Sequence, residues 1–419
     1  MSPEIVNLDF ADLTPDQQVA RLKDQFVLLR GRHAVVRARV GELPVRQYIS
    51  MLERGYRIGL ERDGESFTLV LRPDGSTPRF GLRGAHSVVS HAEGRVYTNT
   101  TDNRIAVIDA STRREQRHIS SGDEPSHLEL SHDGKRLYVA NSGSNDVTII
   151  DTTTDQALAT ISTGRRPLLP CVAANGKSVF LPSGPDRNVT VLGSDGEFRA
   201  KVPVGLAPHD IAVSPDSRWA YQPNSGSHTV TVIDGLNYSV AGEITVGLGP
   251  GHIAFDPESR FAYVANTVSD DVTVISTRDH EVVATIPAGK GAHLPALSPD
   301  GRYGYVANFA SDDVTVWDCR SHRVVATIPV GIYPHFFATS PDGQWLVVSN
   351  TGESSICIID AREHETRARL QVGAAPAHLA FSPDGELAFV GCESTDELAV
   401  IDLRAQTVVE LIKAGQSIQ

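Results

Sequence analysis

Hydrophobic and polar positions alternate in short runs along most of the chain. From about residue 83 onward, four apolar runs separated by polar turns form a unit that recurs to the end of the sequence. In one such unit the runs are His293–Leu297, Tyr303–Asn308, Asp313–Trp317 and Val324–Pro329. Runs of this length, rich in β-branched and aromatic residues and bounded by turns, predict β-strands. A four-stranded unit repeated at a fixed period predicts a β-propeller, in which each repeat forms one blade.

A histidine opens nearly every unit and allows the blades to be counted. These histidines are His86, His127, His209, His252, His293, His335 and His378, and Leu169 takes the place between His127 and His209. The successive spacings are 41, 42, 40, 43, 41, 42 and 43 residues, which makes eight units. The predicted fold is therefore mainly β, an eight-bladed propeller of four-stranded antiparallel blades.

The last unit supplies its own fourth strand at Thr407–Ile412. No strand is then left to be exchanged between the two ends of the chain. We expect the ring to close through face-to-face packing of the first and last blades, with seven blades and an additional half blade as the alternative.

The first part of the chain follows a different pattern. Helical spacing of apolar residues after a Thr14–Gln17 capping box predicts one helix, and residues 45–55 predict a second. Ala34–Val40 alternates as a half-buried strand does, and Tyr56–Glu61 and Ser66–Leu71 flank the hairpin signal Asp63-Gly64. We predict a small α+β domain at residues 1–73, a Gly- and Pro-rich linker at 74–83 and the propeller at 84–419.

Charge excludes several classes of partner. The chain has 38 Lys+Arg and 51 Asp+Glu, a net charge of −13. Residues 1–80 hold 12 basic and 11 acidic residues, so the remainder holds 26 and 40, a net charge of −14. A part of the chain with this much negative charge should repel nucleic acid and anionic lipid. No run approaches the ~18 apolar residues of a membrane span, and the first residues lack the pattern of a secretory signal, so we expect a cytoplasmic protein.

Three short sequence motifs that recur along the chain resemble those of a known repeat family. Tyr-Val-Ala-Asn, Ser-Pro-Asp-Gly and Val-Thr-Val-Ile-Asp resemble the YVTN-type β-propeller repeat over about 330 of the 419 residues. In blade number the chain resembles the d1-haem propeller of cytochrome cd1 nitrite reductase and the d1-haem biosynthesis proteins. It also resembles histidine-rich copper propellers such as nitrous-oxide reductase.

The N-terminal order of strands and helices resembles the small TusA-like sulfur-carrier fold. In that family a Cys-Pro pair opens the first helix, and the cysteine carries sulfur. Thr14-Pro15 stands there in this chain, and residues 1–80 contain no cysteine. The resemblance therefore implies a docking or self-association module, through which residues 1–73 would meet a protein partner, in place of persulfide transfer.

The histidines that open the units are the candidate metal ligands. In a propeller the connection between blades opens onto the axial face, so these seven side chains should converge on one funnel. Imidazole is a common ligand of copper, zinc and iron. The alternative is structural, since WD-type propellers carry a histidine at a comparable connection that only bonds a turn. The remaining histidines (His33, His91, His118, His132, His228, His280, His322 and His364) are expected at the surface.

Basic residues near the funnel are candidates for substrate binding. Arg165 and Arg166 precede the blade that lacks its histidine, and Lys290 precedes His293. Guanidinium groups suit a carboxylate or another anion. The alternative is that they are ordinary solvated side chains.

Together these features favour an oxidoreductase that acts on a small, anionic molecule through a metal held by the histidines. Copper is the first candidate, with iron or zinc as alternatives. A haem d1-like cofactor with one axial histidine is the second hypothesis. The third is a non-enzymatic scaffold with structural histidines.

Overall fold

The computed structural model describes residues 4–9, 34–40, 56–63, 66–73 and 85–414. The chain divides into two compact units, Met1–Phe80 and Gly81–Gln419. Among the described residues, no helix is long and apolar enough to cross a membrane.

The first unit contains a four-stranded sheet. Its strands are β1 (Glu4–Asp9), β2 (Ala34–Val40), β3 (Tyr56–Asp63) and β4 (Ser66–Pro73), in the order β1-β2-β4-β3. β1 runs parallel to β2, and β4 pairs antiparallel with both β2 and β3. The predicted strand at 34–40 and the predicted hairpin are confirmed. The two predicted helices lie outside the described residues.

The second unit is an eight-bladed propeller in which every blade is a sheet of four consecutive strands. The first four blades comprise β5 (Val88–Ser90), β6 (Arg95–Asn99), β7 (Arg104–Asp109), β8 (Arg114–Ser120); β9 (Pro125–Leu130), β10 (Arg136–Asn141), β11 (Asp146–Asp151), β12 (Gln156–Ser162); β13 (Cys171–Val172), β14 (Ser178–Ser183), β15 (Asn188–Gly193), β16 (Phe198–Pro203); and β17 (Ala212–Val213), β18 (Trp219–Asn224), β19 (Thr229–Asp234), β20 (Val240–Thr245).

The last four blades comprise β21 (Pro250–Phe255), β22 (Phe261–Asn266), β23 (Asp271–Ser276), β24 (Glu281–Pro287); β25 (Ala292–Leu297), β26 (Tyr303–Asn308), β27 (Asp313–Asp318), β28 (Arg323–Pro329); β29 (Pro334–Thr339), β30 (Trp345–Asn350), β31 (Ser355–Asp360), β32 (Glu365–Gln371); and β33 (Pro376–Phe381), β34 (Leu387–Cys392), β35 (Glu397–Asp402), β36 (Thr407–Lys413).

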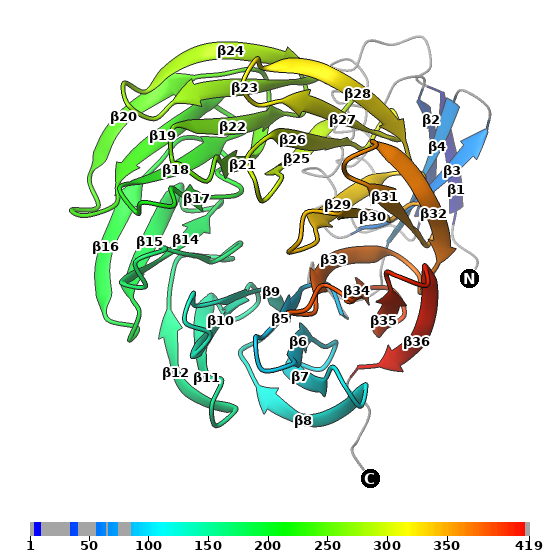
Figure 1. Ribbon diagram of the computed structural model, residues 1–419, viewed down its shortest axis with the longest axis horizontal. Coiled ribbons are helices and arrows are strands. Elements are labelled where there is room, and N and C mark those ends of the chain that lie inside the picture. The colour runs from blue at the N-terminus through cyan, green and yellow to red at the C-terminus, as the bar shows by residue number, and fades with distance from the viewer. Residues whose placement is uncertain (1–3, 10–33, 41–55, 64–65, 74–84, 415–419) are drawn as a thin grey trace. The chain divides into compact units, whose positions relative to one another are not determined.

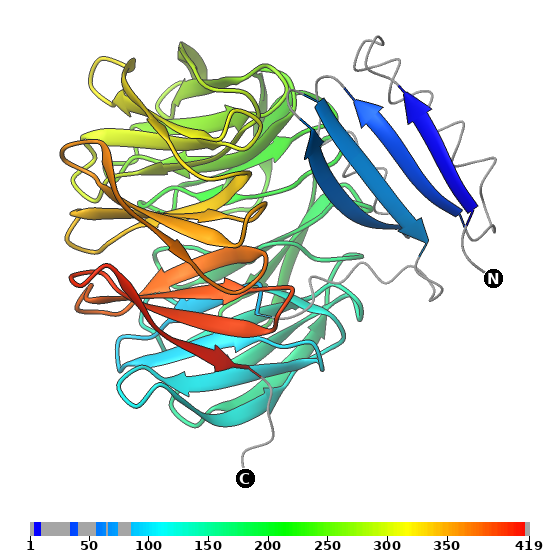
Figure 2. The same ribbon diagram turned by 90° about the vertical axis from the view of Figure 1, so that its right-hand side faces the viewer.

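The blades surround a central axis with their first strands innermost. In Figure 1, β21, β25, β29 and β33 lie nearest the centre, and β24, β28, β32 and β36 lie at the rim. In Figure 2 successive blades lie side by side and pack face to face. The predicted eight-bladed architecture is confirmed.

The recurring sequence motifs form side-chain hydrogen bonds that hold each blade together. In the Ser-Pro-Asp-Gly turn, Ser298 Oγ donates to Asp300 Oδ1 (2.6 Å) and accepts from the backbone N–H of Tyr303 (2.9 Å). Gly301 closes this turn at a φ of 67°, a left-handed conformation that glycine adopts without strain. This turn therefore fixes the register between the first and second strands.

The asparagine that ends Tyr-Val-Ala-Asn ties the second strand to the third. Asn266 Nδ2 donates to Asp271 Oδ1 (2.6 Å) and to Thr273 Oγ1 (2.7 Å). Asn308 makes the same pair of bonds to Asp313 and Thr315. Because a buried amide needs such partners, the same Asn, Asp and Thr also recur together at Asn141, whereas Asn224 bonds to two threonines and Asn350 to a serine and a cysteine.

The ring closes through packing between the last and first blades. The backbone N–H of His378 donates to the carbonyl oxygen of His86 (3.1 Å). Ala85 and Val88 share a buried apolar cluster with Phe389 and Val400. Both blades keep their own four strands. The expected face-to-face closure is confirmed, and the alternative of seven blades and an additional half is wrong.

Candidate metal site

The seven histidines that open the blades lie next to one another around the axis. In one group, ring centroids lie 4.8 Å apart for His86–His378 and 5.3 Å apart for His86–His127. In the other, the centroid distances from His209 through His252 and His293 to His335 are 4.9, 4.5 and 4.9 Å. We call all seven the histidine ring, the first group (His86, His127, His378) the triad, and the second (His209, His252, His293, His335) the row.

The ring draws its histidines from two different register positions. In each blade we take as reference the residue of the first strand that pairs with the third residue of the second strand, such as Glu129 opposite Tyr138. His127, His252 and His378 lie two residues before this reference residue. His86, His209, His293 and His335 lie three residues before that point, as in Ala296 opposite Tyr305. From blade four onward, the spacing measured at one register position is uniform: Asp210, His252, Leu294, Phe336 and His378 are each 42 residues apart.

A β-bulge allows both positions to face the axis. A shift by one residue would ordinarily send a side chain to the opposite face of the strand. In β9, β21, β25, β29 and β33 the pairing with the second strand shifts register at or beside the histidine. Such a bulge redirects one side chain without disturbing the strand that follows.

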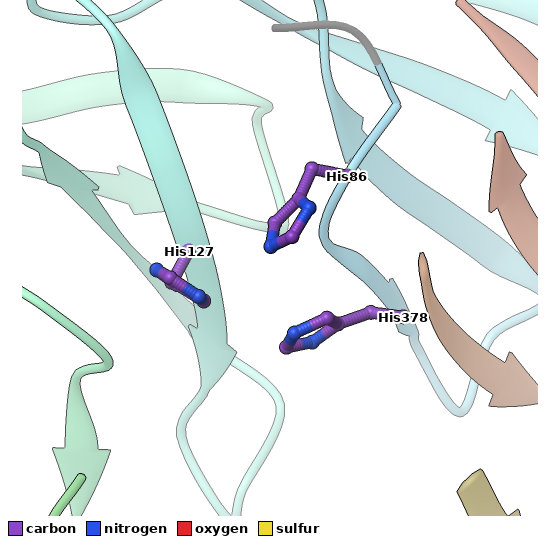
Figure 3. A group of neighbouring side chains, drawn as sticks. All are labelled: His86, His127 and His378. Atoms are coloured by element: carbon purple, nitrogen blue, oxygen red, sulfur yellow. The ribbon is translucent and has the colours of Figure 1, made fainter. Parts of the chain in front are cut away.

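The triad has the geometry of a metal site. One ligand nitrogen from each of His86, His127 and His378 can be chosen so that all three lie within 4.8 Å of one another. The three rings point toward one another from the segment before β5, from β9 and from β33 (Figure 3). His86 and His127 are buried and His378 is partly buried. Among the described residues, this is the one group of three or more such side chains that meets this criterion.

Burial and neighbouring charges keep the imidazoles of His127 and His378 neutral. Burial, followed by the charge of neighbouring imidazoles, holds the pKa of His127 well below its ordinary value. The same two causes hold the pKa of His378 well below its ordinary value. A neutral imidazole has a free lone pair, which is the form that binds a metal ion.

Carboxylates contact two members of the histidine ring. His86 Nδ1 lies 3.3 Å from Glu393 Oε2, and His252 Nδ1 lies 3.0 Å from Asp210 Oδ2. A carboxylate that accepts from one ring nitrogen fixes the tautomer and directs the other nitrogen to a metal. Within the part of the chain that the structure describes, the buried Nδ1 of His127 has no hydrogen-bond partner. The donor set therefore fits a transition-metal ion.

Three acidic residues at the axis were not singled out from the sequence. Asp210 holds the register position that His252 holds in the next blade, and Glu393 comes from the turn after β34. Burial, reinforced by the charge of Asp210, raises the pKa of Glu129 to about 8. The sequence feature that could have identified Glu129 is an acidic residue inside an apolar run, Leu128-Glu129-Leu130, of an innermost strand.

The blade without a ring histidine has an apolar interior at this point. Leu169 precedes β13, and Cys171 packs beside the cluster formed by Ala173, Phe180 and Ile211. Burial raises the pKa of the Cys171 thiol. Such a thiol behaves as a small hydrophobic side chain and not as a thiolate ligand.

The predicted anion-binding residues lie on the connections between blades. The exposed Arg165 guanidinium donates from Nε to Asp186 Oδ1 (2.6 Å), so its charge is already paired. The backbone N–H of Arg166 donates to Asn145 Oδ1 (2.9 Å). Lys290 is exposed, and its carbonyl oxygen accepts from the N–H of Ala310 (3.0 Å). Binding of a substrate by these residues stays a prediction.

Several histidines expected at the surface are structural. His280, His322 and His364 pack edge-on against Trp219, Phe261 and Tyr303 of the preceding blade, with centroid distances of 4.4, 5.2 and 4.7 Å. His91 is buried, and its Nε2 lies 2.9 Å from the carbonyl oxygen of Gly134 in the next blade. The surface expectation is wrong for His91 because it bridges two blades. His33 lies outside the described residues.

Two family models match the chain. The family described as "Lactonase, 7-bladed beta-propeller" matches residues 192–366 and 331–418, which together span more than half of the sequence. The family described as "YNCE-like beta-propeller" matches residues 83–169. Neither match reaches residues 1–82, so the TusA-like resemblance gains no support. No curated protein matches the chain.

Solved structures share the fold at low sequence identity. The chain is similar to dihydro-haem d1 dehydrogenase NirN in complex with DHE, with a TM-score of 0.66, 18% identity, and coverage of 77% of this chain and 74% of that one. For hydrazine synthase of Kuenenia stuttgartiensis the values are 0.55, 18%, 78% and 98%. For a chain of the mitotic checkpoint complex they are 0.56, 16%, 66% and 92%. Proteins of such different descriptions share an architecture, which alone does not define a function.

Proposed function

The chain belongs to the β-propeller family described as "Lactonase, 7-bladed beta-propeller", and on that premise we propose that it is a metal-dependent oxidoreductase whose ion is held by the histidine ring. Its eight blades exceed the number in the family's description by one. Membership supports the architecture, whereas the metal is supported by the site.

The convergence of histidines from two register positions supports this function above any other observation. A histidine kept only to form a blade corner would hold the same register position in every blade. Instead, His86 and His127 reach the axis from neighbouring positions of their strands, and the same alternation separates His209 from His252. What the seven blades share is the position of the imidazole at the axis and not the register position of the histidine, as expected for metal ligands.

His86, His127 and His378 would hold the ion. Three neutral nitrogen ligands leave a coordination position for a small molecule. Among divalent first-row metals, nitrogen sites favour copper most strongly, so we propose copper, which supplies one-electron redox chemistry when bound. Glu393 would orient the ring of His86, and burial would keep His127 and His378 neutral.

A haem d1-like cofactor is the second candidate, favoured by the fold similarity to dihydro-haem d1 dehydrogenase. One histidine of the ring would then be an axial ligand. An intense Soret band in the purified protein would identify the haem, whereas copper bound to imidazoles gives weak visible absorbance.

Metal content tests the site. Replacements are taken from residues that hold the same register positions in other blades: His127→Leu and His378→Leu follow Leu169, and His86→Ser follows Ser126. We expect elemental analysis of the full chain to find metal in the wild type and none in this triple variant. The matched control changes three row residues, His252→Leu, His293→Ser and His335→Ala, and should keep the triad's ion. Equal metal content in wild type and triad variant would contradict the proposal and favour the scaffold.

A further inference from the structure

The described loops that surround the histidine ring present one equivalent position before each of blades two to eight. Each of these loops contains a glycine followed by a residue whose carbonyl oxygen accepts from the next blade, at or beside the turn between its second and third strands. Examples are Leu206 with Gly226 N (2.9 Å), Leu248 with Val268 N (3.0 Å) and Ile332 with Gly352 N (3.0 Å). This residue lies three or four positions before the ring histidine, within about 10–14 Å of it along the chain.

The chemistry of this position changes around the ring. It is charged before blades two, three and six, as Asp123, Arg165 and Lys290, and a small alanine, Ala374, before blade eight, but it is large and apolar before blades four, five and seven. There Leu206, Leu248 and Ile332 are exposed by 43, 48 and 38%, and Val268 beside Leu248 by 41%. We call Leu206, Leu248, Val268 and Ile332 the apolar rim.

The apolar rim differs from the other exposed apolar side chains of the described residues. Nine of the remaining ten large ones lie on the fourth strands of blades, and the tenth is Leu236 on a turn. On those strands an apolar residue is part of an alternating pattern. A loop has no such requirement, so large apolar side chains on loops around a funnel need another reason.

An aromatic pair joins the apolar rim to the histidine ring. Tyr333 follows Ile332, and its ring stands parallel to that of His335, with an interplanar angle of 8° and centroids 6.3 Å apart. Tyr333 also packs against Phe309 (5.1 Å), which contacts His293 (5.7 Å). The backbone of Tyr333 has a φ of 57°, a left-handed conformation shared by the equivalent residues Glu124, Arg166, Ala207, Gly249, Gly291 and Ala375. This conformation therefore belongs to the loop, whereas the aromatic side chain is particular to Tyr333.

We infer that the substrate of the proposed metal site carries a flat aromatic portion, which packs on Tyr333 and on Ile332 of the apolar rim while its polar end faces the imidazoles. This inference rests on the proposed function only in calling the bound molecule a substrate. The binding surface itself consists of residues outside the triad, so it can be tested on metal-free protein.

The test uses 1-anilinonaphthalene-8-sulfonate, a flat aromatic anion whose fluorescence rises in apolar surroundings, titrated into the metal-free full chain. Tyr333→Ala and Ile332→Lys introduce the residues that other blades have at these positions, Ala375 and Lys290, so the fold should tolerate them. We expect each to weaken binding about fivefold, the effect of losing one stacked or apolar contact. Val325→Ser, which removes a side chain 50% exposed on β28, is the matched control and should leave binding unchanged.

Competition defines the class of ligand. 2-Naphthoate should displace the probe at lower concentration than decahydro-2-naphthoate, because the two acids share one carbon skeleton and only the former is flat. Equal displacement by both acids, or an effect of Val325→Ser as large as that of Tyr333→Ala, would overturn the inference. A wild-type protein that binds the probe but binds no metal would instead contradict only the proposed function.

Discussion

At the scale of single residues, the carboxylates beside the histidine ring decide how the imidazoles are held. Glu393 contacts His86 in the triad, and Asp210 contacts His252 in the row. Each comes from a different strand or turn than its histidine. Such contacts cannot be read from sequence spacing, because 307 residues separate Glu393 from His86.

Glu393→Gln tests the role of this carboxylate. The amide can still accept a hydrogen bond but lacks the charge that makes the imidazole a stronger ligand, so we expect metal affinity to fall by about tenfold. Competition with a chelator of known affinity measures the change. Glu410→Gln, at an exposed ion pair with Arg113, is the control and should have no effect. Unchanged affinity in Glu393→Gln would remove this residue from the site.

Asp313 offers a test of the pH dependence of stability. Burial, with a smaller contribution from the charge of Asp312, raises the pKa of Asp313 above its ordinary value of 3.8. A raised pKa in the folded state means that stability is lost as pH rises from 3.8 through the folded value. Asparagine, which blade three has at the equivalent Asn188, removes this loss.

We therefore expect Asp313→Asn to increase the free energy of unfolding at pH 7 and to have a smaller effect at pH 4. Urea unfolding of both proteins at the two pH values measures the difference. A larger gain at pH 4 than at pH 7 would show that the sign is wrong.

At the scale of strands and blades, the sequence was informative wherever a pattern repeats. The turn built on Ser298 and the ladder built on Asn266 recur because each blade needs the same bonds, so the blades could be counted. The β-bulges in β9, β21, β25, β29 and β33 could not be foreseen, because they depend on cross-strand pairing. The change between two register positions explains why the histidine spacings vary between 41 and 43 residues from His209 to His378.

The seam between the last and first blades is a testable element of the fold. A Cβ at Gly391 would overlap the carbonyl oxygen of Ala85, whereas a Cβ at Gly242 on β20 has no heavy atom within 4 Å. We expect Gly391→Ala to reduce the free energy of unfolding by about 1–3 kcal/mol, as overpacking does, and Gly242→Ala to leave it nearly unchanged. Denaturant titration compares them. Equal stabilities would mean that the seam is not tightly packed.

At the scale of the whole molecule, the described propeller contains every residue proposed to bind metal or substrate. Residues 1–73 remain the predicted route to a protein partner or to self-association. From the net charge of −14 on residues 81–419 we continue to expect that nucleic acid is not a partner, which stays a prediction. What could not be derived from the sequence is which of the seven histidines act together, because that depends on the closure of the ring between blades eight and one.

X-ray absorption at the copper edge of the full chain loaded with one equivalent of Cu²⁺ tests the central claim most directly. We predict imidazole scatterers from three histidines at ~2.0 Å, and their loss when His86, His127 and His378 are replaced together. Sulfur scatterers at ~2.3 Å, or a spectrum unchanged by that replacement, would contradict the assignment of the triad as the metal site.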